Sequence, residues 1–414
     1  MWAFAKNDPE FKALLEHPDD FVRLAVEARI SVKSTLGETR SSRLIGVAER
    51  NKGFIPNPKK YWGAHTGRMS GSEKLNLENF PRGSELRASL VAPPGYVLCA
   101  VDSANIEARV LPWVAGQLDL LDQFVLQDKK LGLDVYSAMA TKIYGRGVDR
   151  KKYPERDFIP GFVGKAVTLG CGYGLGWTKF QAMIRAGMLG QAGILFDNSF
   201  VESMGVNPEA FYMDKFNRER ADAAFRSWDD RDTHIIHCAV AKKIIDEYRA
   251  SVPKIPALWK YLNDVILPAI HDGREVVFGP NDILRTSKLG IHTPSGFALQ
   301  YSGLHQQKDK ESGKTHWVYH GRNGKQINTW GGALAENIVQ HLARLVITYE
   351  LTLVAERYKV ATMTHDEIVA IIPEDEAEEG IAWITDQMRM TKPWMAGLPI
   401  NAEGNYGRTY KDCK

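Results

Sequence analysis

The sequence predicts an α+β fold, in which a mostly antiparallel sheet is built from two distant parts of the chain and a helical region is inserted between them. The apolar run Tyr96–Val101 is typical of a buried strand. Residues 359–363 and 368–372 have the pattern of a β-hairpin. Between these strands, residues 126–275 alternate amphipathic segments with Gly- and Asn-containing connections and show no strong strand signal.

Length and composition indicate a globular protein with several parts. A chain of 414 residues exceeds what one compact core usually holds, so we expect two or three subdomains. The formal net charge of +3 is too small to indicate nucleic-acid binding by itself, although 53 Lys and Arg and 50 Asp and Glu could be segregated on different faces. The four cysteines form no CxxC pair, which argues against a zinc ribbon or a disulfide framework. No apolar run reaches about 18 residues, so we expect a cytoplasmic protein without membrane contact.

The first half of the sheet carries a candidate catalytic carboxylate. Residues 1 to about 60 have helical and polar character and no obvious chemistry, and prolines at positions 56 and 58 break the helical pattern. The strand that follows ends at Asp102, and apolar residues then recur at helical spacing from Asn105 to Ala115. Asp102 therefore lies where a strand gives way to a helix.

The hairpin carries a second candidate in its turn, Thr364-His365-Asp366-Glu367, after a helix predicted over 334–357. Two-metal phosphoryl transfer needs at least two carboxylates that converge on ions about 3.5–4 Å apart. Asp102 and Asp366 meet this need if the sheet brings the strand end beside the turn. The same residue types are common helix caps and turn formers, so spacing alone leaves the structural alternative open.

The inserted region carries a candidate anion-binding helix face. Lys165, Leu169 and Tyr173 recur every four residues, so a helix would place them on one face. A lysine there can meet a triphosphate as a point charge. The same spacing is equally compatible with a helix whose apolar face packs in the core and whose lysine is exposed to solvent.

The residues around these positions resemble four motifs of DNA polymerase family A, the DNA polymerase I-like enzymes. Residues 102–109 resemble motif A, 164–174 resemble motif B and 365–367 resemble motif C, while Thr66-Gly67-Arg68 with residues 76–81 resembles the segment upstream of motif A. The motifs occur in the family's order, cover about residues 61–414, and are most similar to the phage members.

The resemblance implies a right-hand polymerase fold with an antiparallel-sheet palm, helical fingers and a truncated thumb. It divides the chain into a thumb remnant and entry to the palm (1–84), palm with motif A (85–125), fingers with motif B (126–275) and palm with motif C (276–414). It also implies a template-directed DNA polymerase that joins dNTPs to the 3′-hydroxyl of primer-template DNA, using two Mg²⁺ ions, in the cytoplasm of a phage-infected bacterium.

The resemblance also implies roles for individual residues. Asp102 and Asp366 would be the metal ligands and, with Glu367, the catalytic residues. The residues implied to bind nucleotide are Lys165, Tyr173, Glu107, Leu169 and Arg156. Those implied to bind DNA are Arg68, His365, Asn79, Arg322 and Gln326. Glu107 would block the ribose 2′-hydroxyl, which favours a DNA polymerase over the related single-subunit RNA polymerases. Arg109 is expected to pair with a carboxylate behind the site.

One departure from the family lies in motif B. Gly161 stands where the family usually has an arginine, four residues before the lysine. Arg156, Lys151 or Lys152 could replace that arginine from the preceding segment. Pro160 is expected to interrupt the helix at this point.

A second departure lies at the start of the chain, where only about 60 residues precede the Thr66-Gly67-Arg68 segment. Residues 27–36 resemble the base of a thumb helix. We therefore expect a chain without its own 3′-5′ exonuclease that works with a separate chain supplying the thumb and perhaps the exonuclease. A fragment, and a catalytically impaired DNA-binding or assembly subunit, are the alternatives.

His234, His237 and Cys238 are close enough in sequence to suggest zinc. No second ligand cluster lies nearby in the sequence, so we expect a helix face rather than a metal site.

Overall fold

The computed structural model describes residues 11, 13–31, 36–188, 191–225, 228, 230–310 and 313–413. The chain divides into two compact units. One comprises residues 1–55, 142–147 and 175–248, and the other residues 56–141, 148–174 and 249–414. The first ten residues of the expected thumb remnant, and positions 32–35 of the expected thumb helix, lie outside the described residues. The predicted domain boundaries stay a prediction.

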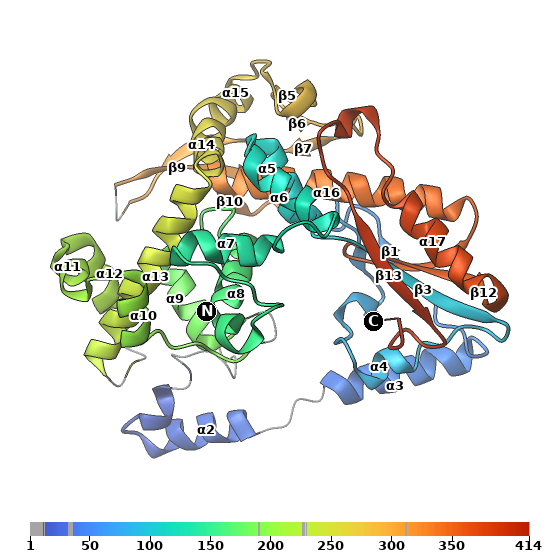
Figure 1. The fold of residues 1–414 in the computed structure, drawn as a ribbon, viewed down its shortest axis with the longest axis horizontal. Helices are drawn as coiled ribbons and strands as arrows, with labels where there is room; N and C mark the ends of the chain where they lie inside the picture. The colour runs from blue at the N-terminus through green and yellow to red at the C-terminus, as the bar shows by residue number, and fades with distance from the viewer. Residues whose placement is uncertain are drawn as a thin grey trace. The chain divides into compact units, whose positions relative to one another are not determined.

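The second unit is built on a four-stranded antiparallel sheet, with its strands in the order β11-β12-β3-β13. Figure 1 labels β3, β12 and β13. The strands are β3 (Tyr96–Ser103), β11 (Lys359–Thr364), β12 (Glu367–Pro373) and β13 (Ala402–Gly407). The strand and the hairpin expected from the sequence are therefore confirmed, as is the α+β fold class. Residues more than 260 positions apart pair directly, because β12 lies beside β3.

Each face of this sheet has its own apolar cluster, as the alternation of side chains along a strand requires. Val97, Cys99 and Val101 of β3 pack toward α16 (Gly331–Ala355) and α17 (Ala377–Gln387). Leu98 and Ala100 pack on the opposite face, with the end of the chain. Helix α16 has the length and apolar composition of a membrane span, but 56% of its most apolar window is buried inside the protein, as in a core helix.

Helix α8 (Pro154–Gly170) carries the candidate lysine and packs on α7 (Val135–Tyr144). The expectation that Pro160 interrupts this helix is wrong: α8 continues through Pro160, whose burial offsets the lost hydrogen bond. A Cβ on Gly164 would lie 2.2 Å from the Tyr136 carbonyl oxygen, so only glycine permits this close packing. The helix ends before Tyr173, in a segment where Gly174 has a φ of 88°. Tyr173 therefore does not continue the helix face of Lys165 and Leu169.

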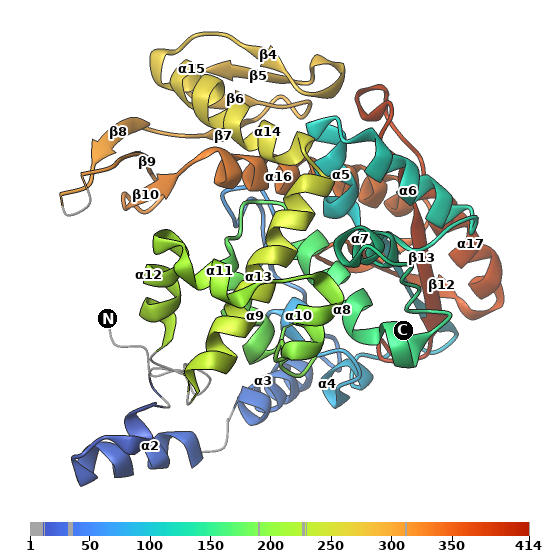
Figure 2. The same ribbon diagram turned by 60° about the vertical axis from the view of Figure 1, so that its left-hand side comes forward.

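Residues 277–329 form two further antiparallel sheets in the second unit (Figure 2). One consists of β4 (Val277–Phe278), β5 (Leu284–Ser287), β6 (Gly290–His292) and β7 (Ala298–Gln300). The other consists of β8 (His305–Lys308), β9 (Thr315–His320) and β10 (Gln326–Thr329), and a small pair joins β1 (Lys59–Lys60) to β2 (Ser70–Gly71). The sequence indicated strand character here only at 275–278, because strands of two to six residues contain too few alternations to reveal a period.

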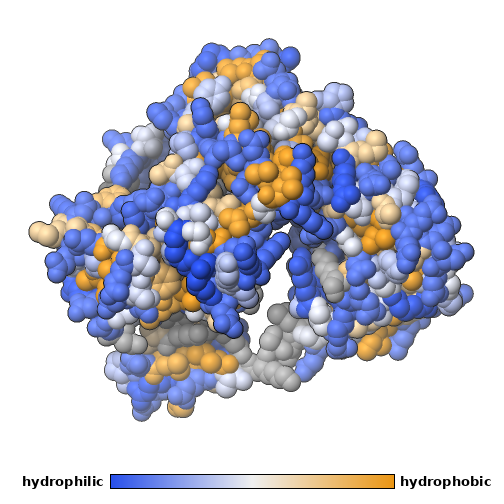
Figure 3. All heavy atoms as spheres, in the orientation of Figure 1, coloured by the Kyte–Doolittle hydropathy of each residue, from blue (hydrophilic) through white to orange (hydrophobic). Residues whose placement is uncertain are grey.

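The remaining helices complete the two units. Those of the first unit are α2 (Asp20–Ser31), α3 (Leu36–Arg50), α9 (Trp177–Ala186), α10 (Asn198–Met204), α11 (Pro208–Met213), α12 (Lys215–Ala224) and most of α13 (Arg231–Ser251). Those of the second are α4 (Glu85–Ala88), α5 (Ile106–Ala115), α6 (Leu118–Asp128), α14 (Lys254–Tyr261) and α15 (Leu267–Asp272). Hydrophilic residues dominate the face drawn in Figure 3, with hydrophobic side chains in scattered patches.

Candidate active site

Asp102 and Asp366 lie at the same edge of the four-stranded sheet. Asp102 is opposite Glu367 in the β3–β12 register, and the Ser103 N–H donates to the Asp366 carbonyl oxygen at 2.9 Å. Asp366 sits in a two-residue hairpin turn behind His365, whose φ of 57° is uncommon for a residue with a side chain. The turn that presents Asp366 therefore holds the neighbouring His365 in a backbone conformation that costs energy, as is common at functional sites.

A third carboxyl group, which the sequence did not single out, lies beneath the first two. Glu350 of α16 is fully buried, and the Ser103 hydroxyl donates to its Oε1 at 3.3 Å. Burial, and after it the charges of Asp366 and Asp102, raise the pKa of Glu350 to about 8, against the opposing effect of the hydrogen bond from Ser103. The three carboxyl groups therefore interact electrostatically. The only sequence signal was a glutamate within a strongly apolar helix.

Glu367 lies inside the sheet. Its side chain is 2% exposed, and the Tyr410 hydroxyl donates to its Oε1. The guanidinium of Arg87 covers the Tyr410 ring at 4.4 Å from its centroid. Burial, then the charge of Glu367, raises the pKa of Tyr410, so the hydroxyl keeps its proton and acts as the donor. The segment after β13 thus fixes the orientation of Glu367.

Arg68 links the upstream segment to this edge of the sheet. It forms an ion pair with Glu107 at the start of α5. Burial lowers the pKa of Arg68, whereas the negative charge of Asp366 and, more weakly, the nearby Tyr173 oppose this shift. Arg68, Asp366 and His365 also line one small cavity, together with Arg344. Arg68, Glu107, Tyr173 and Asp366 are thereby brought together.

Two arginines lie near Lys165 of helix α8. Burial lowers the pKa of Lys165, and the charges of Arg150 and Arg82 lower it further. An Nη2 atom of Arg82 lies 3.9 Å from Asp102 Oδ2. Arg82, Arg150 and Lys165 are therefore close enough to interact electrostatically, and Arg82 is the one that lies beside Asp102.

Arg150, rather than Arg156, lies against Gly161. A Cβ on Gly161 would meet the Arg150 side chain at 2.6 Å from its Cβ and 2.8 Å from its Cδ. The Arg150 Nε donates to Asp134 at 3.1 Å, which orients the guanidinium. Arg156 instead pairs with Asp157 at 2.7 Å. The sequence missed Arg150 because its proximity to α8 depends on the turn that precedes the helix.

The other predicted residues are more dispersed. Leu169 is exposed on α8, and Asn79 is exposed at the end of a 3₁₀ turn, Leu77–Asn79. Gln326 is exposed on β10 and Arg322 donates to the Trp62 carbonyl oxygen from the β9–β10 turn.

The buried Arg109 pairs with Asp128 of α6 through two hydrogen bonds of 2.7 Å. The expected pairing of Arg109 with a carboxylate is confirmed.

The histidines of α13 bind backbone atoms of the first unit. His237 accepts the Phe196 N–H through Nδ1 at 3.0 Å, and its Nε2 lies 2.9 Å from the Gln181 carbonyl oxygen. His234 Nε2 lies 2.8 Å from the Ala221 carbonyl oxygen. Both rings therefore hold neighbouring segments on α13, as expected for a helix face.

The model of DNA polymerase family A matches residues 10–224, which is more than half of the chain. The chain belongs to DNA polymerase family A. The match includes motifs A and B, whereas the turn that carries Asp366 lies beyond it and is located by the structure. Family membership and the fold together account for the order of the motifs in the sequence.

Individual relatives agree with this membership. The DNA polymerase of Bacillus phage SP02 is 26% identical over 79% of this chain and 43% of its own length. DNA polymerase I of Chloroflexus aurantiacus is 34% identical over 41% of this chain and 17% of its own length. The chain thus spans less than half the length of these relatives. The POL domain of Pol1 from M. smegmatis, solved in complex with DNA primer-template and dNTP, has the same fold, with a TM-score of 0.54 and 16% identity over 98% of this chain and 56% of that one.

The buried Glu350 makes stability depend on pH. Its pKa is about 8 in the folded protein and near 4.5 when unfolded, so the folded state binds the additional proton between these values. The free energy of unfolding should therefore fall by up to a few kcal/mol as pH rises through this window. Glu350→Gln should flatten that dependence. Urea unfolding in EDTA at several pH values measures it, and the exposed Glu374→Gln is the control, which should behave as wild type.

Proposed function

We propose that this family A chain is a template-directed DNA polymerase, which joins a dNTP to the 3′-hydroxyl of a DNA primer with release of pyrophosphate. The observation that carries the proposal is the meeting of Asp102 and Asp366 at one sheet edge, beside the cations Arg82, Arg150 and Lys165. Phosphoryl transfer depends mainly on positioning and charge neutralisation, and these groups supply both. The M. smegmatis domain of the same fold was solved with DNA primer-template and dNTP, which supports these substrate classes.

Asp102 and Asp366 fit a site for two Mg²⁺ ions. Both are partly exposed carboxylates, and their charges already act together on Glu350. Mg²⁺ is usually held by one or two carboxylates, with substrate phosphates and waters completing its octahedron. Bound there, Mg²⁺ supplies charge neutralisation and orients the attacking and leaving oxygens.

Residues of the chain itself would bind the nucleotide and the DNA. Lys165, with Arg150 and Arg82, would bind the triphosphate, and Tyr173 and Leu169 would flank the nucleotide. Glu107 would exclude the 2′-hydroxyl, and Arg68 with His365 would contact the primer terminus. Asn79, Arg322 and Gln326 would contact DNA farther from the reacting atoms, and Glu367 would support the turn that carries Asp366.

Two expectations about the whole protein stay predictions. One is that it lacks a 3′-5′ exonuclease, and the other is that a separate chain supplies a thumb. Co-purification from the native source would detect such a partner. We also expect the protein to act in the cytoplasm of a phage-infected bacterium.

Primer extension tests the assignment of Asp366. Asp366→Asn should lower the extension rate by about 10²–10³-fold, because it removes a charge needed most in the transition state, while primer-template affinity stays within about twofold. Asp375→Asn, at an exposed position on the same part of the chain, is the matched control and should extend normally. Near-normal turnover by Asp366→Asn would contradict the assignment of Asp366 as a metal ligand.

A pair of arginine variants tests the triphosphate contact. Arg150→Ala should raise the KM for dNTP by roughly tenfold, since a charge-assisted hydrogen bond contributes about 1.5–3 kcal/mol. Arg156→Ala should leave KM unchanged, because Arg150 and not Arg156 lies against Gly161 of α8. Arg150→Lys keeps the charge and should restore part of the affinity. A larger effect of Arg156→Ala than of Arg150→Ala would reverse the assignment.

Sugar selection tests Glu107. Glu107→Ala should raise ribonucleotide use relative to deoxyribonucleotide use by roughly tenfold or more, because it opens space at the 2′ position. Glu107→Gln keeps the size of the side chain and should retain most of the discrimination. Competition between the two nucleotides on one primer measures the ratio. An unchanged ratio in Glu107→Ala would contradict the proposal that Glu107 excludes the 2′-hydroxyl.

A further inference from the structure

The three-stranded sheet β8-β10 concentrates positive charge outside the candidate active site. Residues 305–328 contain five Lys or Arg and two Asp or Glu, so this short segment has the same formal net charge, +3, as the whole chain. Lys308, Lys310 and Lys325 are exposed. Among the residues that the structure describes, none of these three lysines forms an ion pair. The segment is therefore an exposed basic surface.

One face of this sheet presents neutral hydrogen-bonding groups, whereas the exposed Lys308, opposite Thr315, lies at the end of the other face. Residues opposite one another in the register share a face. Gln307 pairs with His316, Gln326 pairs with His320, and Asn328 lies two positions from Gln326 on the same strand. The exposed members of this face are Gln307, His320, Gln326 and Asn328. Amide and imidazole groups of this kind contact phosphate and sugar oxygens in protein–DNA complexes.

The opposite face fixes the sheet to the rest of the second unit. Trp317 is buried, with its ring centroid 5.7 Å from that of His271. The Tyr319 ring lies 5.3 Å from that of His65, and the Arg322 guanidinium donates to the Trp62 carbonyl oxygen. These contacts attach the sheet to the loop that leads to Arg68.

We propose that the β8-β10 sheet binds the phosphate backbone of the primer-template duplex. This inference rests on the proposed function, because it takes DNA as the substrate. The ends of the six-residue strand β9 lie about 17 Å apart, which corresponds to about five base pairs of duplex. Lysines at the two turns of the sheet are thus spaced to neutralise separate phosphates along the duplex, without reading sequence.

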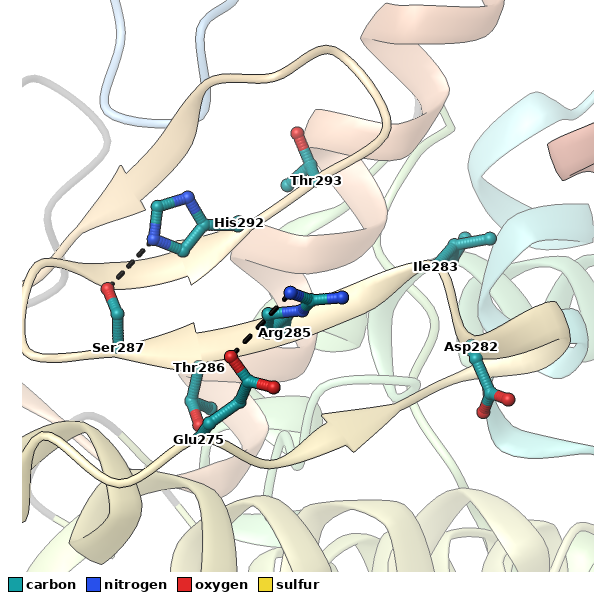
Figure 4. A pocket seen from close by; sticks show the side chains of 8 residues that line it. All are labelled: Glu275, Asp282, Ile283, Arg285, Thr286, Ser287, His292 and Thr293. Atoms are coloured by element: carbon teal, nitrogen blue, oxygen red, sulfur yellow. Dashed lines mark hydrogen bonds and ion pairs between the residues drawn. The ribbon is translucent and has the colours of Figure 1, made fainter.

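The neighbouring hollow of β4-β7 does not extend this basic surface. Figure 4 shows Glu275, Asp282 and Arg285 lining it, with Arg285 paired to Glu275 at 3.6 Å. The His292 ring is hydrogen-bonded to Ser287 at 2.8 Å on the adjacent strand. Charges of both signs line this hollow, so it offers a phosphate chain no net attraction. The proposed duplex contact is confined to β8-β10.

Equilibrium binding at several salt concentrations tests the proposal. The variant is Lys308→Ala/Lys325→Ala, which removes one lysine at each turn, and the probe is a fluorescein-labelled primer-template duplex followed by anisotropy. Affinity should fall by about tenfold at low salt, and the slope of log affinity against log salt should decrease by about two. The control, Lys215→Ala/Lys359→Ala, removes two exposed lysines elsewhere and should keep the wild-type slope.

The ligand and the proposed function are tested separately. A single-stranded template should bind wild type and variant alike, because the proposed contact is with the backbone of the duplex. A loss seen equally with single strands would overturn the assignment to duplex. Unchanged affinity and slope in the variant, in a protein that still extends primers, would overturn the sheet proposal alone. A slope decrease in a protein without extension activity would support the sheet while the proposed function fails.

Discussion

The pairing of β3 with β12 is the interaction on which the site depends. The register runs from Asp102 opposite Glu367 to Tyr96 opposite Pro373, and it is set by the apolar residues that alternate between the two faces. A slip of one residue would exchange the faces of every side chain on the strand. Ser103 would then leave Glu350, and Asp102 would turn into the core. The hydrophobic alternation therefore fixes the geometry of the carboxylates as well as the fold.

The site places carboxyl groups close to one another and close to arginines of opposite charge. Glu350 is buried beside two other carboxylates, which destabilises its charged form and raises its pKa. Arg82 and Arg68 approach the same edge from the upstream segment and carry the opposite charge. Carboxylates with Arg82, Arg150 and Lys165 nearby would suit the proposed substrate, an anion accompanied by metal ions. Ionising Glu350 in this surrounding therefore costs stability.

Arg150 shows how a side chain can fill the space beside a residue that has none. Gly161 has no side chain, and Arg150 fills the space beside it while remaining hydrogen-bonded to Asp134. His341 plays a similar connecting role elsewhere, since its ring bonds the Thr66 carbonyl oxygen and the Thr293 hydroxyl, each at 2.9 Å. Both examples join segments that are distant in sequence. The positions of Arg150 and His341 are therefore set by contacts that no local motif records.

The sequence by itself determined the α+β class, the strand before Asp102, the hairpin around Asp366 and the pairing expected for Arg109, because each depends on local periodicity, turn chemistry or a family motif. Only the tertiary structure decided that Glu350 lies beneath the carboxylates, that Arg150 rather than Arg156 faces Gly161, and that α8 continues through Pro160 but ends before Tyr173. It also revealed the sheets between residues 277 and 329. These features depend on burial and on contacts between distant segments, whose energies outweigh local preference and leave no periodic signal in the chain.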